Sequence, residues 1–206
     1  MKGNTEVFDH AFLMALRANG NPADPIGPAW LEEMGRDVTA LGSYAFLGFV
    51  FLSTLGYLFL LRKRSTAVLL TVSVVGGAIL STLFKLGIDR VRPDIPHAAR
   101  VFTASFPSGH ATLSAVTFLT LGAILASAHS EKRFKIYFVA LSITLTLFVG
   151  LSRLYLGVHY PTDVLSGWCL GAAWAIVCWL TASWHQQRRV IEQPKTQCSA
   201  RPIKKL

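Results

Sequence analysis

The sequence predicts an all-α membrane protein, a helical bundle of about five transmembrane helices with an N-terminal interfacial amphipathic segment. Two observations support this class: 52% of the 206 residues are hydrophobic while only 15% are charged, and the apolar residues fall in long blocks. A bilayer is crossed by about 20 apolar residues whose backbone polar groups must be satisfied within the segment, so each block is expected to be a helix. The expected spans are residues 40–61, 66–88, 108–128, 136–156 and 162–184.

The first 38 residues contain no block of spanning length. Phe8, Phe12 and Leu16 recur at helical spacing, which favours a short amphipathic helix in the interface or, equally, a surface helix packed on the bundle. Residues 19–22 include a glycine and a proline and are expected to break this helix, and a second short helix is expected over 28–39. The chain is thus divided into N-terminal periplasmic or interfacial helices, a transmembrane domain and an unstructured basic cytoplasmic tail: residues 1–38, 39–185 and 186–206.

The net charge of +9 does not indicate a nucleic-acid partner, because most Lys and Arg residues sit in short segments beside the apolar blocks, where they set membrane orientation. Three such segments, at 62–64, 132–135 and 188–205, fall on one side of a five-span bundle, so this side is expected to be cytoplasmic. The N-terminal region and the loops at 89–107 and around His159 then lie on the outer, periplasmic face. The chain is predicted to be a multi-pass protein of the cell (inner) membrane.

Two cations lie inside the predicted spans. Lys85 and Arg153 each sit near the outer end of a span, where they either snorkel to the headgroups or serve a functional site. Arg92 follows Lys85 by seven residues, about two helical turns, so both side chains face one side if the helix continues that far. Asp89 is a possible local salt-bridge partner for Lys85, and Arg90 is interpreted as an ordinary solvated charge.

A helix start beside these cations is suited to hold an anion. Ser108 precedes the third span and is interpreted as its N-cap. The free backbone N–H groups of a helix start attract anions, and Gly109 lets a ligand approach the backbone closely. His110 lies in the same first turn, where an imidazole is suited to act as a general acid.

A histidine and a carboxylate meet at the next helix start. His159 lies just before the fifth span and Asp163 lies in its first turn. A carboxylate on one ring nitrogen fixes the tautomer and leaves the other nitrogen as a nucleophile. Three fixed cations with backbone donors hold a phosphate and offset its transition-state charge. A metal-dependent alternative needs more carboxylates than the sequence places nearby, so no metal and no cofactor are expected.

Three short motifs resemble a known family. Lys85-x6-Arg92-Pro93, Pro107-Ser108-Gly109-His110 and Ser152-Arg153-x5-His159-x3-Asp163 are similar to the three signature motifs of the type 2 phosphatidic acid phosphatase (PAP2) family, which is related to the vanadium haloperoxidases. The resemblance covers residues 85–163, with every motif position filled. The chain departs from the family in one respect, because many bacterial members have six spans and five are found here.

The resemblance implies a role for each motif position. His159 attacks phosphorus and becomes phosphohistidine, Asp163 orients His159, and His110 protonates the leaving oxygen and then activates water. The phosphate is bound by the remaining motif residues: Lys85, Arg92, Ser108, Gly109 and Arg153.

The resulting hypothesis is an integral-membrane lipid phosphatase. Its partners are the bilayer and a lipid phosphate monoester or pyrophosphate, such as phosphatidic acid, phosphatidylglycerol phosphate or undecaprenyl pyrophosphate. A vanadate-binding activity like that of the haloperoxidases and a non-catalytic lipid-binding protein are the alternatives. No motif selects the lipid or the oligomeric state, and the small-residue pair Gly167 and Gly171 is expected to serve helix packing within the chain.

Overall fold

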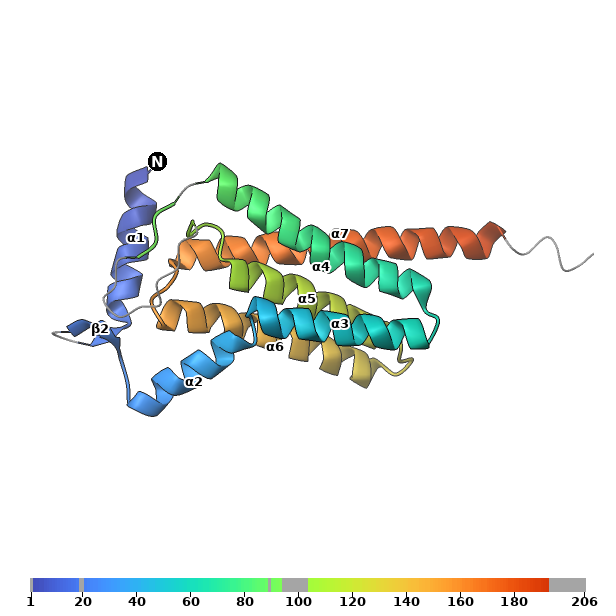
Figure 1. The fold of residues 1–206 in the computed structure, drawn as a ribbon, viewed down its shortest axis with the longest axis horizontal. Coiled ribbons are helices and arrows are strands. Elements are labelled where there is room, and N and C mark those ends of the chain that lie inside the picture. Colours follow the sequence, from blue (N-terminus) through green and yellow to red (C-terminus); the bar gives the residue numbers. More distant parts are fainter. Residues whose placement is uncertain (1, 19–20, 89, 94–103, 193–206) are drawn as a thin grey trace, which may run out of the picture.

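The computed structural model describes all residues except 1, 19–20, 89, 94–103 and 193–206. Five long helices run side by side along one axis and form the bundle shown in Figure 1. They are α3 (Tyr44–Leu60), α4 (Arg64–Gly87), α5 (Gly109–Ser127), α6 (Lys132–Tyr155) and α7 (Pro161–Glu192).

Four of these helices, α4 to α7, are long and apolar enough to cross a membrane, with α7 counted as far as His185. Helix α3 forms a fifth span when it is joined to α2 (Ala29–Ala40), from which it is bent by 44°. The class predicted from the sequence, a multi-pass helical membrane protein, is therefore confirmed. The first predicted span began four residues too early, because Ser43 ends the preceding turn and accepts a hydrogen bond from the Phe46 N–H at 3.2 Å as the N-cap of α3.

Helix α5 is the centre of the bundle. In an apolar stretch of 18 residues, 67% of α5 is buried inside the protein, whereas 22–28% of the corresponding stretches of α4, α6 and α7 is buried. The small-residue pair on α7 packs against it: a Cβ on Gly171 would lie 2.6 Å from the Thr112 carbonyl oxygen, and one on Gly167 would lie 2.9 Å from the Ser108 carbonyl oxygen. The prediction that these glycines serve packing within the chain is confirmed.

The N-terminal region contains more structure than expected. Helix α1 (Lys2–Ala15) lies across one end of the bundle, as Figure 1 shows. Residues 19–20 of the predicted break lie outside the described residues. The remaining two, 21–22, begin β2 (Asn21–Pro25), which pairs antiparallel with β1 (Arg17–Ala18), so the structure is not purely helical. The second predicted helix is α2, which begins directly after Pro28.

Helix α1 presents two different faces. Val7, Phe8 and Phe12 are exposed to the outside, as expected for an apolar face in a membrane interface. Asp9 and Leu13, one turn apart on the other face, are buried against the bundle. The surface-packing interpretation is therefore correct for the second face, while insertion of the first face into a membrane stays a prediction.

The two ends of the bundle differ in character. At one end lie α1, the last turns of α4 and α6 and the first turns of α5 and α7, as Figure 1 shows. At the opposite end lie the α3–α4 and α5–α6 turns and the far end of α7, which continues to Glu192 past the boundary expected at 185. The predicted tail beyond 192 lies outside the described residues. All three motifs meet at the first end, as the topology predicted.

The packing of α7 on α5 can be tested by Gly171→Leu. The new side chain meets a backbone carbonyl and the Ala115 Cβ, neither of which moves freely, so the free energy of unfolding should fall by about 1–3 kcal/mol. Thermal unfolding in detergent should show a lower Tm. The matched control is Gly56→Leu on α3, where nothing lies within 4 Å of an added Cβ. Equal melting of the two variants would contradict this account of the packing.

Candidate active site

The first part of the site is the start of α5. Ser108 is the N-cap, as predicted: it is fully buried, and its hydroxyl accepts from the Ala111 N–H at 3.5 Å. Its own N–H donates to the Asp163 carbonyl oxygen at 2.9 Å, which ties the start of α5 to the first turn of α7. His110 follows in the first turn of α5. Its side chain is half-buried and lies close enough to His159 for the two rings to interact electrostatically.

The second part is a buried pair at the start of α7. His159 is 1% exposed, and its Nδ1 lies 3.5 Å from Oδ2 of Asp163, which is fully buried. The same Oδ2 accepts from the Ser105 hydroxyl at 2.5 Å and from the Tyr160 N–H at 3.0 Å. Asp163 is therefore held by several donors at once, and it faces one ring nitrogen of His159, as expected from the sequence; that nitrogen is Nδ1.

The contact on the other side of the His159 ring defines its tautomer. Arg92 Nη1 lies 3.1 Å from Nε2 of His159 and also donates to the Val158 carbonyl oxygen at 3.0 Å. A guanidinium is only a donor, so Nε2 is assigned as an acceptor and the ring proton belongs on Nδ1, beside Asp163. The nitrogen with the free lone pair therefore faces the cation.

Burial lowers the pKa of His159 to about 4, with the nearby Arg92 and Arg153 acting in the same direction. The hydrogen bond that Nδ1 of His159 donates to Asp163, together with the negative charge of that carboxylate, opposes this shift but does not outweigh it. Since the ordinary histidine pKa is about 6.5, the ring is neutral at neutral pH. A neutral imidazole with a fixed tautomer is the form that a nucleophile needs.

Two further cations reach the same region. Arg153 is only 7% exposed; its Nη1 donates to Thr39 on α2 at 3.2 Å, while its Nε has no hydrogen-bond partner among the described residues. Lys85 Nζ donates to the Ala104 carbonyl oxygen at 2.8 Å. A Cβ on Gly109 would lie 3.6 Å from Cε of Lys85, so this lysine lies close to the start of α5.

All eight predicted site residues thus lie at one end of the bundle. The backbone that leads from Lys85 to Arg92 differs from the helix that the sequence suggested. Helix α4 ends at Gly87, so the chain beyond it, rather than a continuing helix, carries Arg92 to His159. Asp89, the suggested local partner of Lys85, lies outside the described residues.

The interpretation of Arg90 as a solvated charge is wrong. Its guanidinium forms ion pairs with Asp163 at 2.7 Å and with Asp9 of α1 at 2.6 Å. Ser105 was also missed, since a lone serine in a loop carries no sequence signal. The sequence contained a weak indication that Arg90 belongs to the site, because it lies two residues before a motif arginine. Its two carboxylate partners could not be identified, because they lie far away in the sequence.

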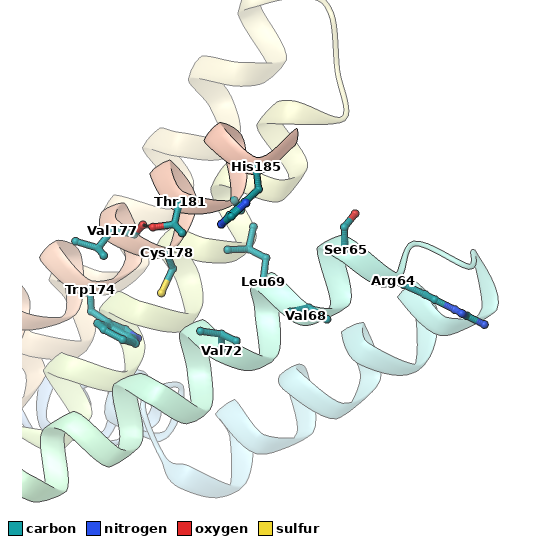
Figure 2. Close-up of a pocket in the computed structure, with 11 residues that line it drawn as sticks. Arg64, Ser65, Val68, Leu69, Val72, Trp174, Val177, Cys178, Thr181 and His185 are labelled. Atoms are coloured by element: carbon teal, nitrogen blue, oxygen red, sulfur yellow. Dashed lines mark hydrogen bonds between the residues drawn. The ribbon is translucent and has the colours of Figure 1, made fainter. Parts of the chain in front are cut away.

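The described residues contain no group of three or more His, Cys, Asp or Glu side chains placed to hold a metal ion. A separate groove of about 770 Å³ lies between α4 and α7 near the opposite end of the bundle (Figure 2). Its lining is mostly apolar, including Val72 and Trp174, with Arg64 and His185 at one end. It contains none of the motif residues.

The fold and the site together define a multi-pass helical membrane protein in which a buried histidine–carboxylate pair and three cations, a combination suited to an anionic ligand, lie at one end of the bundle. The family model of the PAP2 superfamily matches residues 66–187 of this sequence. The chain therefore belongs to the PAP2 superfamily.

Similar proteins agree with this assignment. The chain is 32% identical over 167 residues to phosphatidylglycerophosphatase B of Bacillus subtilis, covering 80% of this chain and 82% of that protein. It is 32% identical over 182 residues to a lipid A 1-phosphatase of Rhizobium johnstonii, covering 74% and 70% of the two chains. The crystal structure of a transmembrane PAP2-type phosphatidylglycerolphosphate phosphatase from Bacillus subtilis superposes with a TM-score of 0.79 at 26% identity, over 91% of this chain and 88% of that one.

The prediction of a membrane lipid phosphatase of this family is thereby confirmed at the level of the class. The relation to the haloperoxidases stays a prediction, as do the roles of the individual site residues.

The pKa of His159 can be measured directly by NMR on protein labelled at histidine. The ring should stay neutral from pH 7 down to about pH 5, because its pKa is lowered to about 4. Arg92→Gln should raise this pKa, since it removes a nearby positive charge, and Asp163→Asn should lower it, since it removes the stabilising carboxylate. A His159 ring that titrates at 6.5 or above in the folded protein would contradict the described environment.

Proposed function

We propose that this protein hydrolyses the phosphate of a membrane lipid through a phosphohistidine intermediate formed on His159. The observation that supports the proposal best is the orientation of this ring: Nδ1 faces the carboxylate of Asp163 and Nε2 faces the guanidinium of Arg92. A nitrogen lone pair beside a cation is placed to meet an anionic phosphate.

In the first step, Nε2 of His159 attacks phosphorus and forms a P–N bond while the P–O bond to the lipid breaks. His110 enters this step as the imidazolium and gives one proton to the departing lipid oxygen, which leaves as an alcohol, or as a lipid monophosphate if the substrate is a pyrophosphate. The imidazolium that forms on His159 is stabilised by Asp163, which lies 3.5 Å from Nδ1. Asp163 stays ionised throughout.

In the second step, neutral His110 takes a proton from water and the resulting hydroxide attacks phosphorus. The P–N bond breaks, inorganic phosphate leaves and His159 returns to its neutral form. One residue serves as acid and then as base, so the proton balance closes over the cycle.

The phosphate is held by cations and by a helix start. Arg153 has a buried Nε with no partner among the described residues, and an anion supplies what this donor lacks. Lys85 and Arg92 carry the other positive charges. The backbone N–H groups at Gly109 and His110 lie in the first turn of α5, where the helix dipole favours a negative charge.

The substrate class follows from the position of the site. The reacting groups lie at helix ends in a membrane bundle, where a lipid brings its headgroup while its chains stay in hydrocarbon. The two similar proteins from Bacillus subtilis and Rhizobium johnstonii are named as phosphatases of lipid substrates. We propose a lipid phosphate monoester as the principal substrate, with a lipid pyrophosphate as the alternative.

The site is proposed to face outward, into the periplasm. The turns at the opposite end carry Arg62 and Lys63 between α3 and α4, and Lys132 at the start of α6. Such basic turns favour the cytoplasmic side.

The roles of the two histidines can be separated with purified protein and a panel of lipid phosphates and pyrophosphates. His159→Ala removes the nucleophile, so kcat should fall by about 10⁴-fold or more and no acid-labile phosphoenzyme should form. His110→Ala removes the acid, so kcat should fall by about 100-fold or more for an alkyl leaving group. A nitrophenyl leaving group should suffer much less, because it needs no proton.

The same assay includes EDTA, which should leave the activity unchanged. Normal hydrolysis of the whole panel by His159→Ala would show that the nucleophile is another group. Equal losses for both leaving groups in His110→Ala would exclude its role as the acid.

Orientation can be tested by cysteine labelling in cells, in a background from which Cys169, Cys178 and Cys198 have been removed. Glu6→Cys lies on exposed surface at the catalytic end, and Ser130→Cys lies on exposed surface at the opposite end. An impermeant thiol reagent should label the first in intact cells and the second only after permeabilisation. The reverse pattern would place the site in the cytoplasm.

A further inference from the structure

A second buried carboxylate lies next to the site and takes no part in the proposed chemistry. Asp9, on α1, is fully buried although it belongs to a helix that lies across the end of the bundle. A buried carboxylate is costly unless hydrogen bonds and opposite charge compensate it. Its partners therefore indicate what it holds in place.

Asp9 contacts two residues that lie far away in the sequence. Its Oδ2 pairs with Arg90 Nη2 at 2.6 Å and accepts from the Thr162 hydroxyl at 2.5 Å. Its Oδ1 accepts from the Thr162 N–H at 3.1 Å. Thr162 is the second residue of α7, so a side chain of α1 satisfies a free N–H at the start of the catalytic helix.

Arg90 connects this carboxylate to Asp163. Its Nη1 donates to Oδ1 of Asp163 at 2.7 Å and to the Thr162 hydroxyl at 2.7 Å. The guanidinium carbon lies 4.4 Å from the centre of the Tyr160 ring, which restricts its orientation further. The backbone of Arg90 is also fixed, because its carbonyl oxygen accepts from the Ser105 N–H at 2.8 Å.

The two oxygens of Asp163 are thereby used differently. Oδ1 binds Arg90, while Oδ2 accepts from Ser105 and faces the ring of His159. Rotation of the carboxylate would break the bond to Arg90. The position of Arg90 depends in turn on Asp9.

We propose that Asp9 is a positioning residue, and that the Asp9–Arg90 pair fixes the carboxylate of Asp163 so that His159 stays aligned for attack. This inference rests on the proposed function, because it gives Asp163 the task of orienting His159. The N-terminal helix α1 then supports the geometry of the active site through Asp9.

The alternative is that the pair only attaches α1 to the bundle. The apolar side chain of Leu13 also attaches α1 to the bundle, since it lies one turn beyond Asp9 on the same face and is 1% exposed. This contact can be removed without changing Asp9. Leu13→Ala weakens this attachment without changing a charge or a hydrogen bond. The attachment role predicts that Asp9→Asn and Leu13→Ala act alike.

The test compares three variants of the full-length protein in detergent micelles with phosphatidic acid as the substrate. Asp9→Asn should lower kcat by about 10- to 100-fold, a loss of the size seen when hydrogen-bond partners behind an active group are removed. KM should change little, because Asp9 does not contact the phosphate-binding groups. Leu13→Ala should lower Tm and leave the kcat of the folded enzyme unchanged. Glu6→Gln, which removes an exposed carboxylate from the same helix, should change neither.

Two further variants keep the proposal testable if Asp9→Asn folds poorly. Thr162→Val removes the hydroxyl that bridges Asp9 and Arg90 without leaving a buried charge unpaired, and it should lower kcat at constant KM. In an Arg90→Gln background, Asp9→Asn should cause little additional loss, because both act through one contact to Asp163.

The outcomes separate this proposal from the proposed function. If His159→Ala is inactive while Asp9→Asn and Thr162→Val keep the wild-type kcat, the positioning role is wrong and the function stands. The same holds if Asp9→Asn lowers Tm alone, as Leu13→Ala does. If His159→Ala remains active, the proposed function itself fails.

Discussion

The structure of the catalytic end depends on the compensation of one buried carboxylate, that of Asp163. It lies in the first turn of a membrane helix, where an unpaired negative charge would be strongly unfavourable. Ser105, the Tyr160 N–H and Arg90 provide its donors, and each arrives from a different part of the chain. The loop before α5, the loop before α7 and the segment after α4 are therefore held together by the need to satisfy a single side chain.

The positive charges at the ends of the membrane helices are compensated less completely than this carboxylate. Arg153 is almost completely buried and donates to Thr39, while Lys85 donates to a backbone carbonyl. Neither contact neutralises the positive charge, and no carboxylate partner for Arg153 occurs among the described residues. A site with more cationic charge than its own carboxylates balance is ready for an anion, which agrees with the phosphatase class that the family defines.

Much of this could be predicted from the sequence, for identifiable reasons. The spans were visible because hydrocarbon requires about 20 apolar residues for each crossing. The motif residues were visible because Lys85 and Arg153 are charges in apolar blocks, and because Ser108 and Asp163 lie at the starts of helices. Arg90 was misjudged because an arginine near the end of a span is usually solvated, and its partner Asp9 lies 81 residues away.

The sequence by itself therefore determined the membrane class, the approximate helices and the motif residues that meet at one end of the bundle, because local composition and spacing are enough to recognise each of these. Only the tertiary structure decided that α1 packs the face carrying Asp9 and Leu13 on the end of the bundle where the motifs meet, and exposes the face carrying Val7, Phe8 and Phe12. It also decided the contacts of Asp163, since hydrogen bonds across such separations depend on how helices are placed and leave no periodic pattern in the chain. The pKa of His159 also depends on the tertiary structure. The sequence shows the nearby carboxylate of Asp163, which raises this pKa, but only the folded protein buries the ring, and burial lowers the pKa to about 4.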